Sequence, residues 1–216
     1  MSEVEADYIV IEGPIGVGKT SLARRLAESL DADLLLEEAE DNPFLERFYR
    51  NPRQAALPTQ LSFLLKRAQQ VNDVRQSDLF HPVRVADFLM EKDRLFAELT
   101  LDSDELQLYR QVYSHLTVDA PKPNLVVYLQ APVDVLLNRI ARRGRRYEQR
   151  IEAAYLQRIC DAYTEFFYNY HDSPLLIVNA AAINLIDNED DYRQLQQQIR
   201  TTRSGRHYFN PLPLNL

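Results

Sequence analysis

Short apolar segments alternate with longer amphipathic segments along most of the chain. The apolar segments are nearly continuous in hydrophobicity and rich in leucine and β-branched residues, which is typical of strands buried on both faces. Five such strands are predicted, at residues 8–12, 33–37, 82–88, 124–130 and 174–180.

The segments between these strands carry helical patterns. Leu22, Leu26 and Leu30 follow one another at intervals of four, which places them on one helical face. Helices are predicted at residues 19–30, 59–76, 103–116, 134–143, 148–171 and 190–200. Strands that alternate with helices indicate right-handed βαβ units, and therefore an α/β fold with a five-stranded parallel sheet and helices on both faces.

No linker or repeat divides the chain, so residues 1–216 are predicted to form a single domain. The last part of the chain, residues 203–216, contains two prolines and is predicted to be an irregular tail.

Charge and cysteine content narrow the classes of partner. The formal net charge of −7 disfavours nucleic acid, because neutralising a phosphate backbone needs a basic surface. The single cysteine, Cys160, excludes an internal disulfide and a site built from several thiolates. No apolar signal core follows the first methionine, and no apolar run approaches the ~20 residues of a membrane span. These features predict a cytoplasmic protein without a membrane partner.

A phosphate-binding motif lies between the first predicted strand and the first predicted helix. The pattern G-x4-G-K-T matches Walker A in full and in the required strand–loop–helix context. Backbone N–H groups of such a loop surround a nucleotide phosphate, Lys19 is predicted to bridge the β- and γ-phosphates of ATP, and the Thr20 hydroxyl is predicted to bind Mg²⁺. The predicted ATP-binding loop consists of Gly13, Pro14, Ile15, Gly16, Val17, Gly18, Lys19 and Thr20.

The rest of the sequence favours a small kinase over other nucleotide-binding proteins. The Asp-x-x-Gly and Asn-Lys-x-Asp motifs of GTPases do not occur, and no predicted strand ends in the Asp-Glu pair typical of motor ATPases. Arg139 and Arg143 lie four residues apart on one predicted helix, and Arg145 follows the glycine that ends it. An arginine cluster of this kind suits a lid that closes over the transferred phosphoryl group, so Arg139 and Arg143 are predicted to assist catalysis.

Four segments in order resemble the deoxyribonucleoside kinases, in particular the bacterial branch that phosphorylates deoxyadenosine, deoxyguanosine or deoxycytidine. They read EGPIGVGKTSLA, LEEAEDNPFLERFY, TQLSFLLKR and RIARRGRRYE, within a resemblance that spans residues 8–179. The resemblance implies a P-loop kinase fold with an arginine-rich lid and a homodimer, in which residues 59–76 and 103–116 are candidate interface helices. It also implies an Mg²⁺- and ATP-dependent transfer of the γ-phosphoryl group to the 5′-hydroxyl of a deoxyribonucleoside, with purines slightly favoured.

The resemblance also implies a role for individual residues. Glu37, at the end of the second strand, matches the glutamate that accepts the proton of the 5′-hydroxyl, although Glu38 and Glu40 stand close by. Tyr49 and Glu148 match positions that hold the sugar 3′-hydroxyl. The nucleobase is expected to contact Gln60, Arg67 and Phe96.

One region departs from the family pattern. The third strand of the family ends in Asp/Glu-Arg-Ser, whereas this chain reads Ala86-Asp87-Phe88 when aligned through residues 95–97. Asp87 is therefore predicted to act at the 5′-hydroxyl or at the metal, and Arg84, Lys92 and Arg94 are candidates to replace the lost arginine. The usual partner aspartate of the base-reading arginine is not found at its aligned position.

Two other functions fit parts of the sequence. A thymidylate-type nucleoside monophosphate kinase shares the sheet, the loop and the lid, but the acidic run from Glu37 to Asp41 would repel a phosphorylated acceptor. A non-catalytic ATP-binding module is the second alternative, and the presence of Lys19, Thr20, Glu37 and the lid arginines together disfavours it.

Overall fold

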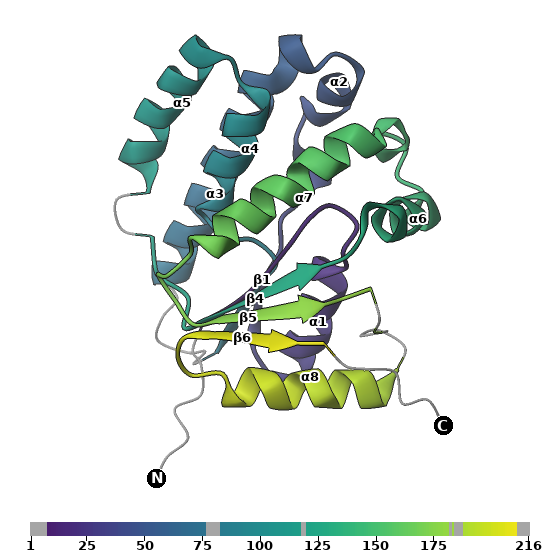
Figure 1. Cartoon of the computed structure of the whole chain (residues 1–216). Coiled ribbons are helices and arrows are strands. Elements are labelled where there is room, and N and C mark those ends of the chain that lie inside the picture. The colour runs from purple at the N-terminus through teal and green to yellow at the C-terminus, as the bar shows by residue number, and fades with distance from the viewer. Residues whose placement is uncertain (1–7, 77–82, 118–119, 182, 184–187, 211–216) are drawn as a thin grey trace.

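A parallel β-sheet with helices on both faces forms the centre of the molecule (Figure 1). The computed structural model describes residues 8–76, 83–117, 120–181, 183 and 188–210. The strands lie in the order β2 (Asp33–Leu35), β3 (Arg84–Ala86), β1 (Tyr8–Glu12), β4 (Leu125–Gln130), β5 (Leu175–Asn179) and β6 (Arg206–Phe209). The prediction of a parallel α/β sheet is confirmed.

The helices match the predicted pattern closely, with two short additions. They are α1 (Lys19–Leu30), α2 (Leu45–Arg50), α3 (Pro52–Gln76), α4 (Lys92–Thr100), α5 (Ser103–Leu116), α6 (Val133–Arg143), α7 (Ala153–Tyr168) and α8 (Glu189–Thr201), with 3₁₀ turns at Ala39–Asp41 and Glu148–Arg150. Helix α3 begins earlier than predicted, because Pro52 suits a first helical position and the helix continues through Pro58. The predicted helix at 148–171 starts only at Ala153, after the second of these 3₁₀ turns.

Alternate side chains of the central strands pack in opposite directions. Ile9 and Ile11 of β1 belong to the same buried cluster as Leu22 and Leu26 of α1 and the buried face of α8. Val10 belongs to a second cluster with β4, α4 and α7. Strands buried on both faces explain why the sequence shows continuous apolar runs rather than alternation.

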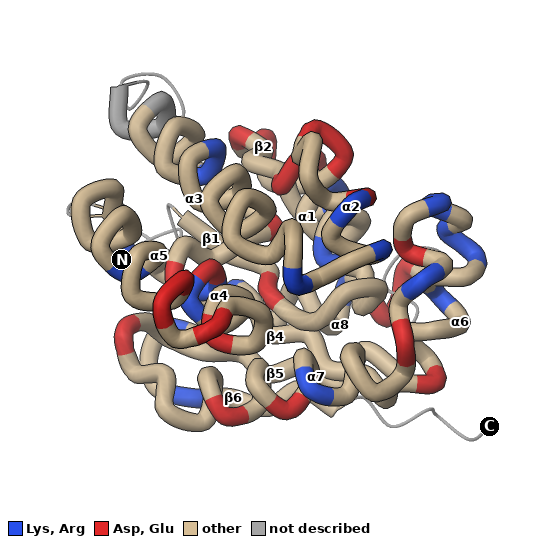
Figure 2. The backbone as a smooth tube through the Cα atoms, turned by 90° about the horizontal axis from the view of Figure 1, so that it is seen from above, with Lys and Arg blue, Asp and Glu red and all other residues tan. Residues whose placement is uncertain are grey.

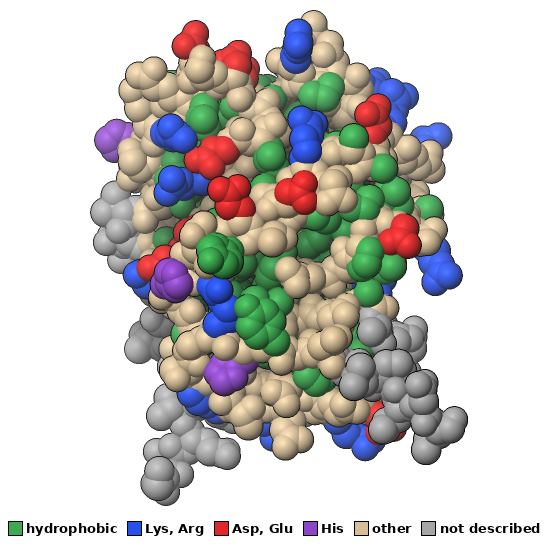
Figure 3. All heavy atoms as spheres, viewed as in Figure 1, with side chains coloured by type: hydrophobic (Ala, Val, Ile, Leu, Met, Phe, Trp, Pro, Cys, Tyr) green, Lys and Arg blue, Asp and Glu red, His purple; other side chains and the backbone are tan. Residues whose placement is uncertain are grey.

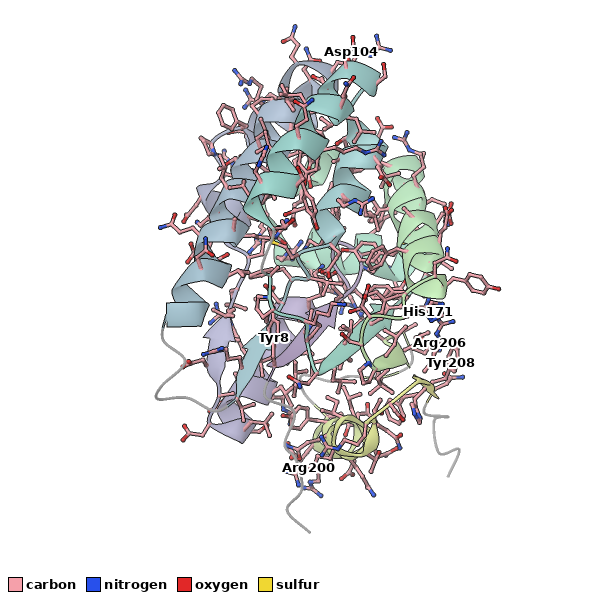
Figure 4. The ribbon with its side chains drawn as sticks, turned by 90° about the vertical axis from the view of Figure 1, so that its left-hand side faces the viewer. Tyr8, Asp104, His171, Arg200, Arg206 and Tyr208 are labelled. Atoms are coloured by element: carbon pink, nitrogen blue, oxygen red, sulfur yellow. The ribbon has the colours of Figure 1, made fainter. Side chains whose placement is uncertain are left out.

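A sixth strand corrects the prediction of five strands and of an irregular tail at 203–216. Strand β6 pairs in parallel with β5, from Leu175 opposite Arg206 to Val178 opposite Phe209. The guanidinium of Arg206 donates to the carbonyl groups of Phe167 and Tyr168, at 2.9 and 2.8 Å, at the end of α7. This contact and the β5–β6 ladder order the segment, and Figure 4 shows Arg206 and Tyr208 on this edge strand. The prolines of the predicted tail lie outside the described residues.

The upper helices form a layer beyond the sheet. Helices α3, α4 and α5 share a buried cluster that includes Leu64, Ala97 and Tyr109, and Figure 4 views the molecule from this side. An Asp102 capping box starts α5: the Asp102 carboxylate accepts from the backbone N–H of Glu105, and the Glu105 carboxylate accepts from the backbone N–H of Asp102. Among the described helices, none is both long and apolar enough to cross a membrane.

Gly13 brings the loop after β1 against the backbone of β4. Its φ of +148° is one that side chains rarely tolerate, and an added Cβ would lie 2.4 Å from the carbonyl oxygen of Leu129. We expect Gly13→Ala to lower the free energy of unfolding by about 3–4 kcal/mol, from backbone strain and the steric clash together. Urea unfolding monitored by circular dichroism measures this loss.

Gly205→Ala is the matched control for this prediction. Gly205 also has a positive φ, of +70°, but no atom lies within 4 Å of its added Cβ. The control should lose only about 1–2 kcal/mol, the cost of a left-handed residue alone. An equal loss in the two variants would contradict a close approach at Gly13.

Candidate active site

A cavity opens at the carboxyl ends of β1, β2 and β3, and α2, α3 and α4 contribute to its wall. In an open parallel sheet this edge is where ligands bind. Its lining contains most of the residues that the sequence singles out. They come from the loop after β1 and the start of α1, from the segments after β2 and β3, from α2, α3 and α4, and from the end of α6 and the turn after it. These are Ile15, Gly16, Lys19, Thr20, Glu37, Tyr49, Gln60, Arg67, Asp87, Phe96, Arg143, Arg145 and Glu148.

The loop after β1 has the geometry of an anion cradle. Gly16 and Gly18 have φ values of +84° and +107°, and Gly18 leads directly into α1 without a side-chain cap. The N–H groups at the start of α1 are therefore available to an anion, and the helix dipole adds positive potential. Lys19 donates from Nζ to the carbonyl groups of Gly13 and Pro14, at 2.6 and 3.2 Å. Burial, and then the like charge of Lys92, lower the pKa of Lys19 to about 8, so an incoming anion would stabilise its charge.

Two side chains whose oxygen atoms could bind a metal ion lie together beside this cradle. The hydroxyl of Thr20 donates to Oδ2 of Asp87, and Oδ1 of Asp87 accepts from the backbone N–H of Glu37 at 2.7 Å. Burial raises the pKa of Asp87. A cation bound nearby would lower that pKa again. A hydroxyl and one carboxylate suit Mg²⁺, which commonly uses one or two protein oxygens together with nucleotide phosphates. Within the described part of the chain, no cluster of three or more His, Cys, Asp or Glu side chains is suited to hold a metal without such a ligand.

Glu37 faces the cavity between two cations. One carboxylate oxygen forms an ion pair with Arg67, and the other accepts from Nζ of Lys92 at 2.8 Å. Burial alone would raise the pKa of Glu37, but Arg67 and Lys92 outweigh it and lower the pKa to about 2. Glu37 is therefore a carboxylate throughout the neutral range.

Arg67 has a second acidic partner, Asp93, which the sequence alignment did not place. The two side chains form an ion pair, and both are almost fully buried, at 3% and 2% exposure. The guanidinium also lies 5.4 Å from the ring centre of Phe63. The sequence interpretation that Arg67 lacks an aspartate is therefore wrong: α4 begins one residue before Asp93 and turns its carboxylate toward α3.

Gln60 and Arg67 lie on one face of α3, as their spacing predicts, and both line the cavity. The Gln60 amide donates to the Thr100 hydroxyl at 3.2 Å and is 3% exposed. The neighbouring walls are aromatic and include Phe48, Phe63, Phe96 and Tyr155. This end of the cavity therefore combines a flat apolar lining with an amide and a guanidinium.

Tyr49 and Glu148 come together from α2 and the 3₁₀ turn at Glu148–Arg150. Both side chains line the cavity, and the ring of Tyr49 stacks on Tyr147 with centroids 6.0 Å apart. Burial is the main cause that raises the pKa of Tyr49 well above its usual value, so its phenol stays a donor. The carboxylate of Glu148 accepts from Arg143 at 2.9 and 2.6 Å.

The predicted arginine lid divides into two parts. Figure 2 shows Lys and Arg concentrated on α6 and the turn that follows it. Arg143 and Arg145 line the cavity, with Arg145 also 2.9 Å from Glu40. Arg139 does not line it: its guanidinium donates to the carbonyl groups of Val17 and Ala180, at 3.1 and 2.8 Å. Arg139 lies one helical turn before Arg143 and holds the phosphate loop against the end of β5. This contact differs from the prediction that Arg139 contacts the phosphates.

Other loop residues also lie outside this cavity. Gly13, Val17 and Gly18 shape the loop through their backbones, and Pro14 lines a separate shallow groove beside β5 and β6. Sequence reasoning did not assign roles to several lining residues. These are Ala39, Leu45, Thr59, Asp93, Tyr147 and Tyr155. Among them only Asp93 gave a signal, as a charged residue beside Lys92, which the sequence names as one of three candidates to replace the lost arginine.

The sequence matches a family model and several characterised relatives. The model for "Deoxynucleoside kinase" matches residues 9–203. The chain is 34% identical to the deoxyguanosine kinase of Bacillus subtilis, over 90% of this chain and 97% of that protein. It is 28% identical to the deoxyadenosine kinase of Lactobacillus acidophilus, over 88% of this chain and 94% of that protein.

The fold is also shared with a solved structure. The deoxyadenosine kinase from M. mycoides with bound dATP superposes with a TM-score of 0.77 at 22% identity, covering 89% of this chain and 98% of that chain. The cavity joins a phosphate cradle to the carboxylate of Glu37, and the family model covers almost all of the described residues. The chain is an enzyme, a kinase, and it belongs to the deoxynucleoside kinase family.

Proposed function

We propose that this kinase transfers the γ-phosphoryl group of ATP to the 5′-hydroxyl of a deoxyribonucleoside, giving a deoxynucleoside monophosphate for nucleotide salvage. The observation that carries the proposal is one cavity that is lined both by Lys19 and Thr20 and by Gln60 and Arg67. Glu37 lies between these two groups, because Arg67 pairs with its carboxylate and Asp87 links its backbone N–H to Thr20. An acceptor hydroxyl would meet the donor phosphate there.

The donor phosphates are proposed to lie on the loop from Gly13 to Thr20, near Lys19. Mg²⁺, held by Thr20 and Asp87, would supply charge neutralisation at the phosphate oxygens. Arg143 and Arg145 approach from the lid side and add positive charge, while Arg139 fixes the loop from behind.

The acceptor is proposed to lie with its base against the aromatic end of the cavity. Gln60 offers a donor and an acceptor to a base edge, Arg67 offers donors, and Phe96 forms part of the wall. Tyr49 and Glu148 provide a donor and an acceptor for the sugar 3′-hydroxyl. Glu37 then orients the 5′-hydroxyl and accepts its proton.

An unphosphorylated acceptor is favoured by Glu37 rather than by the whole acidic run. Glu38, Glu40 and Asp41 do not line the cavity, and their side chains are 58%, 64% and 64% exposed and paired with Lys66 or Arg145. The sequence argument against a monophosphate acceptor therefore depends on one carboxylate, which lies inside the cavity.

A homodimer is proposed from the family resemblance. Two of the large hydrophobic side chains that are exposed, Leu65 on α3 and Leu108 on α5, lie on the helices that the sequence indicates as interface candidates, at 54% and 48% exposure. Apolar side chains also reach the surface on the face that carries α7 (Figure 3). Light scattering of the purified protein, which measures the mass of the assembly, tests this proposal.

The proposed reaction predicts a specific dependence on the acceptor. We expect ADP release with deoxyadenosine and deoxyguanosine, weaker release with deoxycytidine, and none above background with deoxynucleoside monophosphates. The purine preference follows the relatives, which are named deoxyguanosine and deoxyadenosine kinases. A coupled ADP assay over the four deoxynucleosides and their monophosphates measures it. Release that does not depend on an acceptor, or that occurs only with monophosphates, would contradict the proposed function.

Removing the charge of Glu37 should separate binding from chemistry. We expect Glu37→Gln to keep nucleoside binding but to lose kcat by about 10²–10⁴-fold, because a positioned proton acceptor contributes this much to transfer. Steady-state kinetics and calorimetric titration with nucleoside measure the two effects. Glu38→Gln is the matched control, since Glu38 is exposed and paired with Lys66, and its kcat should stay within about twofold. Retained kcat in Glu37→Gln would mean that another group accepts the proton.

Asp87 is proposed to support the metal through Thr20. We expect Asp87→Ala to raise the Mg²⁺ concentration for half-maximal activity by about 10–100-fold, the usual cost of losing a metal-site carboxylate or its support. A magnesium titration at saturating ATP measures the shift. Asp104→Ala, on α5 at the far end of the molecule (Figure 4), serves as control and should leave the titration unchanged. An Asp87→Ala enzyme with wild-type magnesium dependence would overturn the assignment.

A further inference from the structure

Lys92 lies where a charged side chain is costly unless it is closely paired. It is the first residue of α4, and only 4% of its surface is exposed. Its Nζ lies 2.8 Å from Oε2 of Glu37 and 3.4 Å from Oε1 of Glu12. A buried ammonium needs such partners to offset the loss of its hydration.

Glu12 is fixed more firmly than the other partner, Glu37. It is fully buried and accepts hydrogen bonds from the N–H groups of Gly13 and Leu89, at 2.8 and 3.0 Å. The hydroxyl of Tyr163 on α7 donates to it at 2.8 Å. Glu12 thus anchors Lys92 to the end of β1, while the ammonium points onward to Glu37 at the cavity.

The start of α4 supplies both cationic contacts of Glu37. Lys92 reaches the carboxylate directly, and the next residue, Asp93, holds Arg67, which contacts the other oxygen of Glu37. Each carboxylate oxygen of Glu37 therefore has a separate cation, which restricts rotation of the group. Of these two cations, only Lys92 also pairs with Glu12 of β1, the strand that precedes the phosphate loop.

We propose that Lys92 is a positioning residue for phosphoryl transfer, which holds the Glu37 carboxylate toward the acceptor hydroxyl. This inference rests on the proposed function and names a residue that the sequence left among three candidates. Lys92 and Lys19 both line the cavity, and after burial the charge of Lys92 is the next cause that lowers the pKa of Lys19, so the two ammonium groups lie near one another.

The test is a double-mutant cycle between Lys92 and Glu37. We expect Lys92→Met to lower kcat by at least 50-fold, while the Kd for nucleoside, measured by calorimetry, changes less than about threefold. If Lys92 acts through Glu37, the variant Lys92→Met/Glu37→Gln should have the same kcat as Glu37→Gln alone, within about threefold. The variant Lys92→Arg keeps the positive charge, so its kcat should be at least tenfold higher than that of Lys92→Met. Lys122→Met removes an exposed lysine that pairs with Asp172 and should leave both kcat and the Kd for nucleoside unchanged.

Several outcomes would overturn the inference. A kcat of Lys92→Met within threefold of wild type, or losses that multiply in the double variant, would show that Lys92 does not act through Glu37. If Lys92→Met does not fold in thermal melts, Lys92→Met/Glu12→Gln replaces it in the cycle, because it removes the buried cation together with its anchoring charge. Wild-type enzyme without deoxynucleoside-dependent ADP release would refute the proposed function itself, whereas an active wild type with an indifferent Lys92 refutes only this inference.

Discussion

A buried chain of alternating charges fixes the geometry of the cavity. It runs from Glu12 through Lys92, Glu37 and Arg67 to Asp93, and every link is an ion pair between different parts of the fold. Removing one member of a buried pair typically costs about 3–5 kcal/mol, because its partner is left without compensation. The end of β1, the segment after β2, α3 and the start of α4 must therefore keep their mutual positions for all of these charges to be satisfied.

The same constraint joins the phosphate cradle to the part of the cavity proposed to hold the acceptor. Asp87 accepts from the hydroxyl of Thr20 and from the backbone N–H of Glu37, so one carboxylate ties the first turn of α1 to the proposed proton acceptor. Arg139 adds a brace on the other side of the loop, through the carbonyl groups of Val17 and Ala180. The two halves of the site are thus held at a fixed separation before any ligand binds, which is the preorganisation that phosphoryl transfer needs.

The sequence could predict the parts of this arrangement that local rules determine. The loop from Gly13 to Thr20 follows a strand and precedes a helix, and the spacing of Gln60 and Arg67 implies one helical face, so both were predictable from short-range pattern. The pairing of Arg67 with Asp93 was not, because it depends on where α4 begins and how it is rotated. The choice of Lys92 over Arg84 and Arg94 likewise needs tertiary structure. Strand β6 escaped prediction because a four-residue edge strand with two exposed residues carries no apolar run.

The charge network also limits what Glu37 can contribute chemically. With a pKa of about 2 in the chain without substrate, its carboxylate binds a proton only weakly. Loose phosphoryl transfer makes little demand on a strong base, since the acceptor hydroxyl loses its proton late and positioning supplies most of the rate. Lys92 and Arg67 each hold one oxygen of that carboxylate, so the two cations that depress its pKa also fix its orientation.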